Sequence, residues 1–101
     1  MTFVRILFMG DVMRNNILVA AARAFDLPTD IVAGLPRIEI LGMRQILIEN
    51  HRGILSYDTR QVAVSGGAVT LLLKGEGFVI KAMNARELRL EGVLFSMEVE
   101  Y

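Results

Sequence analysis

The sequence contains no cysteine and no tryptophan, and it has one histidine and two prolines. Without cysteine, the chain can form no disulfide framework, thiol nucleophile or cysteine-based metal site. It also lacks an excess of charge of either sign, because 11 Lys and Arg balance 11 Asp and Glu to a formal net charge of zero. Nucleic-acid-binding domains usually carry a basic patch or stripe, so this balance argues against a nucleic-acid partner.

Long apolar runs are absent as well. The two runs near the start, residues 3–9 and 17–22, are much shorter than the about 20 residues that a membrane-spanning helix needs. As a signal peptide the start is poor, because the first run holds a single arginine and Asp11 follows soon after it. We therefore expect a cytoplasmic protein.

Hydrophobic residues make up 53% of the 101 residues, which suits the core of a single domain. We expect this domain to have two parts, an N-terminal helical segment over residues 1–36 and a β-sandwich over residues 37–101. Asp11 is a suitable N-cap for a helix that runs to about Phe25. The apolar face of that helix would contain Met13, Ile17, Ala20, Ala21 and Ala24. It would pack on the sheet or, alternatively, dock on a partner or a membrane.

From Arg37 onward, apolar residues recur with a period of two, as in Ile38 and Ile40 or Leu88 and Leu90. Between these stretches, turn-forming residues recur about every eight residues. They are Gly53, residues 58–59, residues 66–67, residues 75–77, Asn84 and Gly92. The gaps are too short for the crossover helices of a parallel sheet. The pattern predicts a mainly β fold, an antiparallel sandwich or barrel of short meander strands.

Several predicted strands are apolar on both faces, such as residues 46–48, 71–73 and 78–80. A strand with one face in water usually alternates more cleanly, so something should cover the second face. The N-terminal helix is one candidate, and a second copy of the chain in a homo-oligomer is the other. The final strand ends at Tyr101. If that strand is an edge, it offers unpaired backbone groups to a partner.

No set of side chains predicts catalysis. A Ser-His-Asp group could be drawn only from His51 and Asp58 with Ser56 or Ser65, and no G-x-S-x-G motif surrounds either serine. Glu49 and His51 would share a strand face as two metal ligands, but two ligands do not complete a site. We therefore expect a protein that is not an enzyme and has no catalytic residue, metal site or cofactor.

The most individual segment is residues 48–54, with the sequence Ile-Glu-Asn-His-Arg-Gly-Ile. We interpret it as a hairpin loop, because Asn50 and Gly53 suit the first and fourth positions of a type I turn. Arg52 could bind a carboxylate or a phosphate with two parallel hydrogen bonds. The candidate interaction residues are Asn50, His51, Arg52 and Gly53. The alternative is an ordinary turn whose histidine is satisfied by hydrogen bonds.

Around these residues the sequence resembles the YabP/YqfC family of bacterial sporulation proteins, and in particular its YqfC branch. The resemblance runs from residue 27 to about residue 100. It rests on residues 27–32, 35–38, 48–54, 73–75, 78–81, 87–88 and 90–92. Members of the family usually begin with a short segment rich in lysine and arginine, whereas residues 1–26 here are mostly apolar.

The resemblance implies a small immunoglobulin-like β-sandwich from an endospore-forming bacterium, made in the mother cell and needed for spore development. It also implies a partnership with a polytopic membrane protein encoded beside it, with no enzymatic activity or cofactor. A peripheral position at the forespore membrane would follow from such a partner. We therefore expect a non-enzymatic protein that acts through protein–protein interaction in development of the spore envelope, cortex or coat. The alternative is a module or enzyme that binds a small anion through His51 and Arg52.

Overall fold

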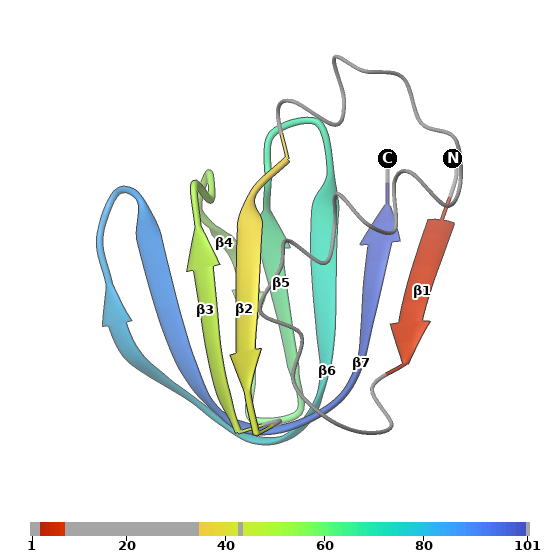
Figure 1. Ribbon diagram of the computed structural model, residues 1–101, viewed down its shortest axis with the longest axis vertical. Coiled ribbons are helices and arrows are strands. Elements are labelled where there is room, and N and C mark those ends of the chain that lie inside the picture. The colour runs from red at the N-terminus through yellow and green to blue at the C-terminus, as the bar shows by residue number, and fades with distance from the viewer. Residues whose placement is uncertain (1–2, 8–34, 43, 101) are drawn as a thin grey trace.

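The computed structural model describes residues 3–7, 35–42 and 44–100, which form seven β-strands and their connections (Figure 1). All strand pairs are antiparallel. The strands are β1 (Phe3–Leu7), β2 (Arg37–Leu41), β3 (Gln45–Glu49), β4 (Ile54–Tyr57), β5 (Gln61–Ser65), β6 (Thr70–Met83) and β7 (Glu87–Glu100). The mainly β, antiparallel fold that the sequence predicted is therefore confirmed.

The strands form one sheet in the order β2-β3-β7-β6-β5-β4, and β1 pairs with β7 beside this series. Strands β6 and β7 are 14 residues long each, and their two halves have different neighbours. The first half of β7 lies between β3 and the second half of β6. Its second half lies between β1 and the first half of β6, from which β5 and β4 continue the sheet.

The β6–β7 hairpin bends near its middle, so that the sheet folds over on itself (Figure 1). Two glycines make the bend possible because the strands approach each other too closely for a side chain. A Cβ on Gly75 would lie 1.9 Å from the carbonyl oxygen of Val93, and a Cβ on Gly92 would lie 2.8 Å from Cδ1 of Phe78. The turns predicted at residues 75–77 and at Gly92 are wrong, since these glycines lie inside continuous strands.

The inner face of the folded sheet forms the hydrophobic core, to which both halves contribute. Side chains alternate along each strand, so every second residue points inward. Phe78 lies at the bend and is fully buried. The other buried apolar residues are Leu35, Ile38, Ile40, Ile46, Ile48, Val62, Val64, Val69, Leu71, Leu73, Leu88, Leu90, Leu94, Met97 and Val99.

The last strand is not the exposed edge that the sequence suggested, because both halves of β7 have a neighbour on each side. Its alternation also changes at the bend. Ser96 and Met97 are both buried, while Phe95 is 51% exposed. A register shift in the β6–β7 pairing inserts one extra residue here, and such an insertion moves the following side chains to the opposite face.

The helix predicted from Asp11 to about Phe25 lies outside the described residues. Within the segment predicted as helical, residues 1–36, the structure places β1, a strand that the sequence analysis did not identify. The division of the domain at residue 36 and the immunoglobulin-like arrangement stay predictions. In the described part of the chain, no helix is long and apolar enough to span a membrane.

Candidate functional site

Residues 50–53 connect two strands that are not neighbours in the sheet. Strand β3 lies between β2 and β7, whereas β4 lies at the far end of the order beside β5. The segment therefore crosses from one half of the folded sheet to the other, and the predicted hairpin loop is wrong. Turn-forming residues such as Asn50 and Gly53 suit many kinds of connection. The pairing of the strands on either side depends on contacts between residues that are far apart in the sequence.

Backbone hydrogen bonds hold this crossing segment to two neighbouring turns. The Asn50 N–H donates to the carbonyl of Arg86 over 2.6 Å, with Asn50 at a positive φ of 63°. Further on, the Arg52 N–H donates to the carbonyl of Ser65 over 2.7 Å, and the Ser65 N–H donates to that of Gly53 over 2.8 Å. The backbone on both sides of Arg52 is thereby fixed against the end of β5.

His51 is buried, with 6% of its surface exposed, and both of its ring nitrogens are engaged. Nδ1 accepts a hydrogen bond of 3.0 Å from the Gly53 N–H, and Nε2 lies 2.9 Å from the Asn84 carbonyl oxygen. A nitrogen that accepts from an N–H carries no proton, so the neutral tautomer protonated at Nε2 satisfies both contacts. The Gly53 N–H, at the fourth position of the predicted type I turn, thus donates to the side chain of His51.

This geometry favours the structural role of His51 that the sequence left open beside a recognition role. Its nitrogens face backbone groups, so in this arrangement neither is free to activate a serine or to bind a metal. In the described ranges, no three His, Cys, Asp or Glu residues gather closely enough to hold a metal ion. His51 thus links the crossing segment to the β6–β7 turn.

Arg52, in contrast, is exposed, and the stem of its side chain passes over the β5–β6 turn. A Cβ on Gly67 would lie 3.7 Å from Cγ of Arg52. Among the described residues, the guanidinium of Arg52 has no hydrogen-bond or ion-pair partner. Arg52 and Asn50 therefore point to different neighbours, and the four predicted residues do not converge on one pocket.

Asn50 instead borders an open hollow of about 560 Å³ at this end of the sheet, together with Glu49, Asn84, Arg86 and Glu87. The side-chain Oδ1 of Asn84 accepts the N–H groups of Arg86 and Glu87, each over 2.8 Å, and so fixes the turn. The sequence indicated Asn84 only as a turn residue and did not indicate Arg86 or Glu87 as part of this lining. Only the long-range pairing of β3 with β7 brings Glu49 beside Glu87.

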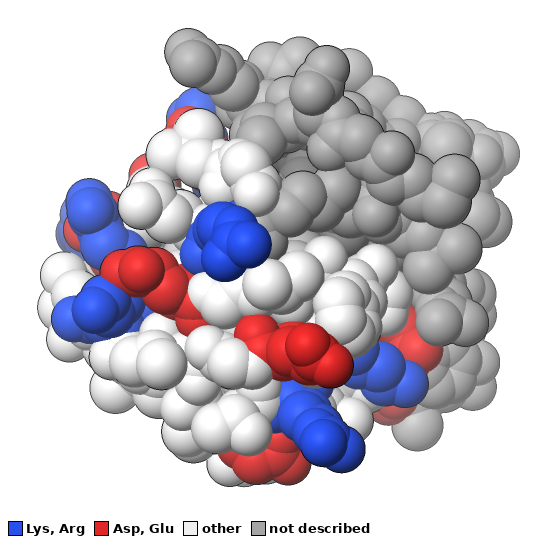
Figure 2. Space-filling model, turned by 90° about the horizontal axis from the view of Figure 1, so that it is seen from below, with Lys and Arg blue, Asp and Glu red and all other residues white. Residues whose placement is uncertain are grey.

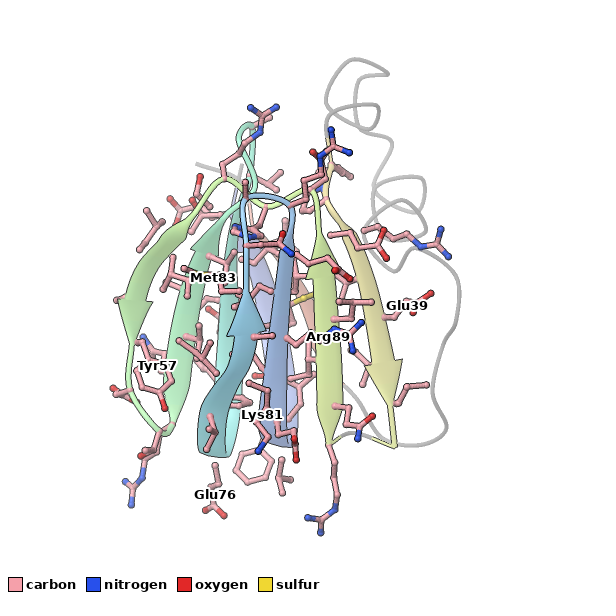
Figure 3. The ribbon with its side chains drawn as sticks, turned by 90° about the vertical axis from the view of Figure 1, so that its left-hand side faces the viewer. Glu39, Tyr57, Glu76, Lys81, Met83 and Arg89 are labelled. Carbon is pink, nitrogen blue, oxygen red and sulfur yellow. The ribbon has the colours of Figure 1, made fainter. Side chains whose placement is uncertain are left out.

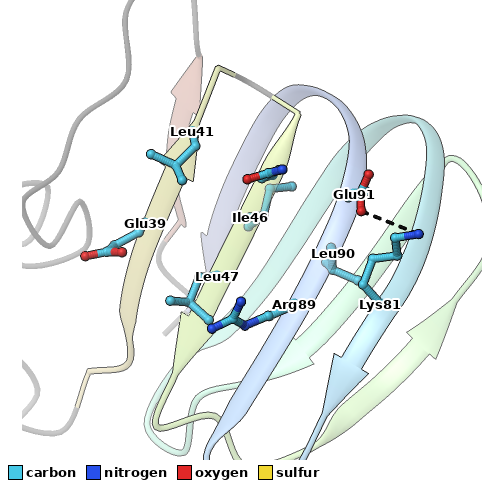
Figure 4. A pocket seen from close by; sticks show the side chains of 9 residues that line it. Glu39, Leu41, Ile46, Leu47, Lys81, Arg89, Leu90 and Glu91 are labelled. Atoms are coloured by element: carbon cyan, nitrogen blue, oxygen red, sulfur yellow. Dashed lines mark ion pairs between the residues drawn. The ribbon is translucent and has the colours of Figure 1, made fainter.

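A second hollow, of about 350 Å³, lies on the outer face of β2, β3, β7 and the second half of β6 (Figure 4). Lys81 Nζ lies 3.5 Å from Glu91 Oε2 at one side of it, and Arg89 and Glu39 add charges of both signs. On the face drawn in Figure 2, acidic and basic side chains are likewise interspersed. At this hollow and on the described residues of that face, charges of both signs therefore offset each other and give no strong field of one sign.

Comparisons with known proteins agree with the resemblance noted in the sequence. The model of the YabP family matches residues 34–100. The chain is 36% identical over 81 residues to the uncharacterized protein YqfC of Bacillus subtilis (strain 168), which covers 80% of this chain and 87% of that protein. No solved structure matches the chain. The matched residues include every strand from β2 to β7 and the crossing segment with Arg52, and the chain belongs to the YabP/YqfC family.

Proposed function

We propose that this chain is a non-enzymatic sporulation protein that acts in the mother cell by binding another protein through the surface around Arg52. The support is its membership of the YabP/YqfC family and the fixed geometry of the crossing segment. The partner that the family resemblance suggests is a polytopic membrane protein encoded beside it. The chain would then work in the cytoplasm, peripheral to the forespore membrane, during development of the spore envelope, cortex or coat.

The observation that carries this proposal is the way the backbone presents Arg52. Hydrogen bonds of 2.7 and 2.8 Å join the backbone on either side of Arg52 to Ser65, and the preceding residue, His51, is buried. A side chain held on a rigid backbone loses less entropy on binding than one on a mobile loop. Arginine also offers five donors in a planar fork, which suits a carboxylate or a backbone carbonyl of a partner.

The alternative function, binding of a small anion by His51 and Arg52 together, has less support. Both ring nitrogens of His51 contact backbone groups, and the Arg52 side chain lies over Gly67. The two side chains therefore do not form a shared pocket for one small ligand. Protein binding needs only the exposed guanidinium and its surroundings, so it agrees better with the geometry.

We expect Arg52→Ala to lower the number of heat-resistant spores and to weaken co-purification with the membrane protein encoded beside this chain. Arg52→Lys should give an intermediate loss, because it keeps the charge but loses the planar fork. Arg60→Ala is the matched control, since Arg60 is also exposed and its guanidinium also has no partner among the described residues. The measurement is a spore count after heating, with a pull-down from sporulating cells.

Two outcomes would contradict the proposal at different levels. Normal spore numbers in a strain that lacks the whole gene would contradict the role in sporulation. A reduced count in that strain, with wild-type counts and binding for Arg52→Ala, would support the role in sporulation and contradict the binding role of Arg52. Equal losses in the Arg52→Ala and Arg60→Ala strains would mean that general surface charge, and not this site, is responsible.

A further inference from the structure

The second half of β6 is an edge of the folded sheet. Strand β5 pairs with residues 70–74 of β6, while residues 79–83 pair only with β7. No other strand lies beside residues 79–83 in the part of the chain that the structure describes, and we call this stretch the open edge of β6. Figure 3 faces this side of the molecule, with Lys81 and Met83 labelled on β6 and Tyr57 on β4.

The open edge of β6 is unusually apolar for an exposed edge. Val79 is 49% exposed, Ile80 37% and Met83 56%, and the neighbouring edge strand β4 adds exposed Leu55 and Tyr57. Five of the seven large apolar side chains that are exposed in the described part of the chain thus lie on these two edges. Natural proteins usually protect such edges with charge, proline, a β-bulge or a covering segment, because free edges pair with other strands. This edge has one lysine, Lys81, and a bulge between Ile80 and Ala82, and is otherwise apolar.

The direction of the backbone groups along this edge follows from hydrogen bonds at its two ends. At the bend, the Phe78 N–H donates to the Thr59 carbonyl over 2.9 Å, so the backbone of Phe78 points away from β7. In a strand the groups of every second residue point the same way, which directs those of Ile80 outward too. At the far end, the Asn84 N–H donates to the Glu87 carbonyl and so faces β7. The backbone N–H and carbonyl of the preceding residue, Met83, therefore face outward.

A register shift between Ile80 and Ala82 accounts for the three-residue step between these two outward-facing residues. The open edge therefore presents two backbone donor–acceptor pairs, at Ile80 and at Met83. In an antiparallel ladder, two residues that face each other exchange both of their hydrogen bonds. A second copy turned by a two-fold axis can place its Met83 opposite Ile80 and its Ile80 opposite Met83. The edge is thus complementary to itself.

Charge also favours this register. It places Lys81 opposite Ala82 of the second copy, whereas a shift of one residue in one direction would place Lys81 opposite Lys81. Like charges directly opposite in a sheet are destabilising. In addition, the ammonium of Lys81 lies 3.5 Å from Glu91, and the chain has a formal net charge of zero, so two copies do not repel each other at long range.

We propose that two copies of this chain form a symmetric dimer through the open edge of β6, with Ile80 of each copy opposite Met83 of the other. The sheet then continues from one copy into the next, and the apolar side chains on the open β6 edges of the two copies become covered. A two-fold arrangement of this kind is closed, so it produces a dimer and not a fibre. The inference goes beyond the proposed function and does not depend on it.

The test is the mass of the purified full-length chain by analytical ultracentrifugation, from about 1 to 100 μM, a range that detects micromolar association. We expect twice the chain mass of 11.2 kDa at the upper end. Met83→Lys and Ile80→Glu should each give the mass of one chain, because each places a charge directly opposite an apolar side chain of the other copy. Leu41→Lys and Phe95→Lys alter exposed apolar residues elsewhere, 47% and 51% exposed, and should leave the dimer intact.

A charge rescue tests the register itself. In a chain that carries both Ile80→Glu and Met83→Lys, the new carboxylate of each copy lies opposite the new ammonium of the other, so the dimer should return. Thermal unfolding of each variant shows that it is folded. A monomeric wild type at about 100 μM would overturn the proposal. So would a dimer that Leu41→Lys or Phe95→Lys disrupts, a dimer that survives both single edge substitutions, or a double variant that stays monomeric.

These outcomes are separate from those of the proposed function, because the mass is measured on purified protein without any partner. An extended segment of another protein could pair with the same edge. In that case the wild type alone would be monomeric, and the dimer proposal would be overturned even if sporulation depends on Met83. Conversely, a dimer would stand even if Arg52 proved to have no role in sporulation.

Discussion

At the scale of single residues, His51 joins segments that are far apart in the sequence. Its Nδ1 receives the Gly53 N–H, and its Nε2 contacts the Asn84 carbonyl, 33 positions away. The imidazole thus satisfies two backbone groups at a buried position and fixes the crossing segment to the β6–β7 turn. Because its ring holds the neighbouring backbone in place, His51 is a positioning residue for Arg52.

We expect His51→Leu to lower the free energy of unfolding by about 1–2 kcal/mol, because two part-buried hydrogen bonds to backbone groups are lost. Arg52→Ala is the control, and as an exposed substitution it should change stability by no more than about 0.5 kcal/mol. Urea unfolding followed by circular dichroism measures both. Similar stability of His51→Leu and the wild type would contradict the role of these two hydrogen bonds in holding the crossing segment.

At the scale of elements, the bend in the β6–β7 hairpin decides the architecture. It allows two 14-residue strands to serve both halves of the sheet and so to close the core. The bend depends on close backbone contact, since a Cβ on Gly75 would lie 1.9 Å from the Val93 carbonyl oxygen. This contact joins main chain to main chain and cannot be relieved by a change of side-chain conformation.

We therefore expect Gly75→Ala to destabilise the fold by more than about 3 kcal/mol, at or beyond the upper range for overpacking. Gly77→Ala is the matched control, because a Cβ there meets nothing within 4 Å and only the positive φ of 66° opposes it. That strain should cost about 1–2 kcal/mol. Denaturant unfolding of the two variants gives the comparison. An equal effect for both would mean that the bend tolerates a side chain at Gly75.

The elements also show how far the sequence could predict this structure. The period of two located β2, β3, β5 and parts of β6 and β7, because alternation depends only on neighbours in the sequence and on one buried face, but it missed β1 and β4. The glycines at residues 75–77 and at Gly92 were interpreted as turns, since a local window cannot distinguish a reversal from a bend within a strand. The prediction of a hairpin loop at residues 50–53 was wrong for the same reason.

The candidate site stays a prediction, and the sequence indicated only its local part. The segment around Arg52 was identified from its composition, and the structure shows that Arg52 is exposed while His51 is buried. The contribution of Asn84, Arg86 and Glu87 was missed because they lie more than 30 positions away and reach residues 49–51 only through the pairing of β3 with β7. No local pattern carries that information.

At the scale of the whole molecule, the sheet order predicts where the structure opens first. Strand β7 has neighbours on both sides in each half, so its hydrogen-bonded amides can exchange only when large parts of the sheet separate. Strand β4 pairs with β5 alone and is mostly exposed, so its amides should exchange through local opening. Hydrogen exchange read by mass spectrometry or NMR should therefore show the slowest amides in β7 and faster ones in β4.

The same experiment separates the open edge of β6 from the other edges. In a monomer, the amides of Ile80 and Met83 point away from β7 and should exchange about as fast as those of β4. In the proposed dimer they donate across the interface and should become protected, and Met83→Lys should remove this protection at Ile80 but not in β7. Equal exchange at Ile80 in the wild type and in Met83→Lys, at a concentration where the wild type is dimeric, would place the interface elsewhere. Fast exchange in β7 would contradict the central position that the strand order gives it.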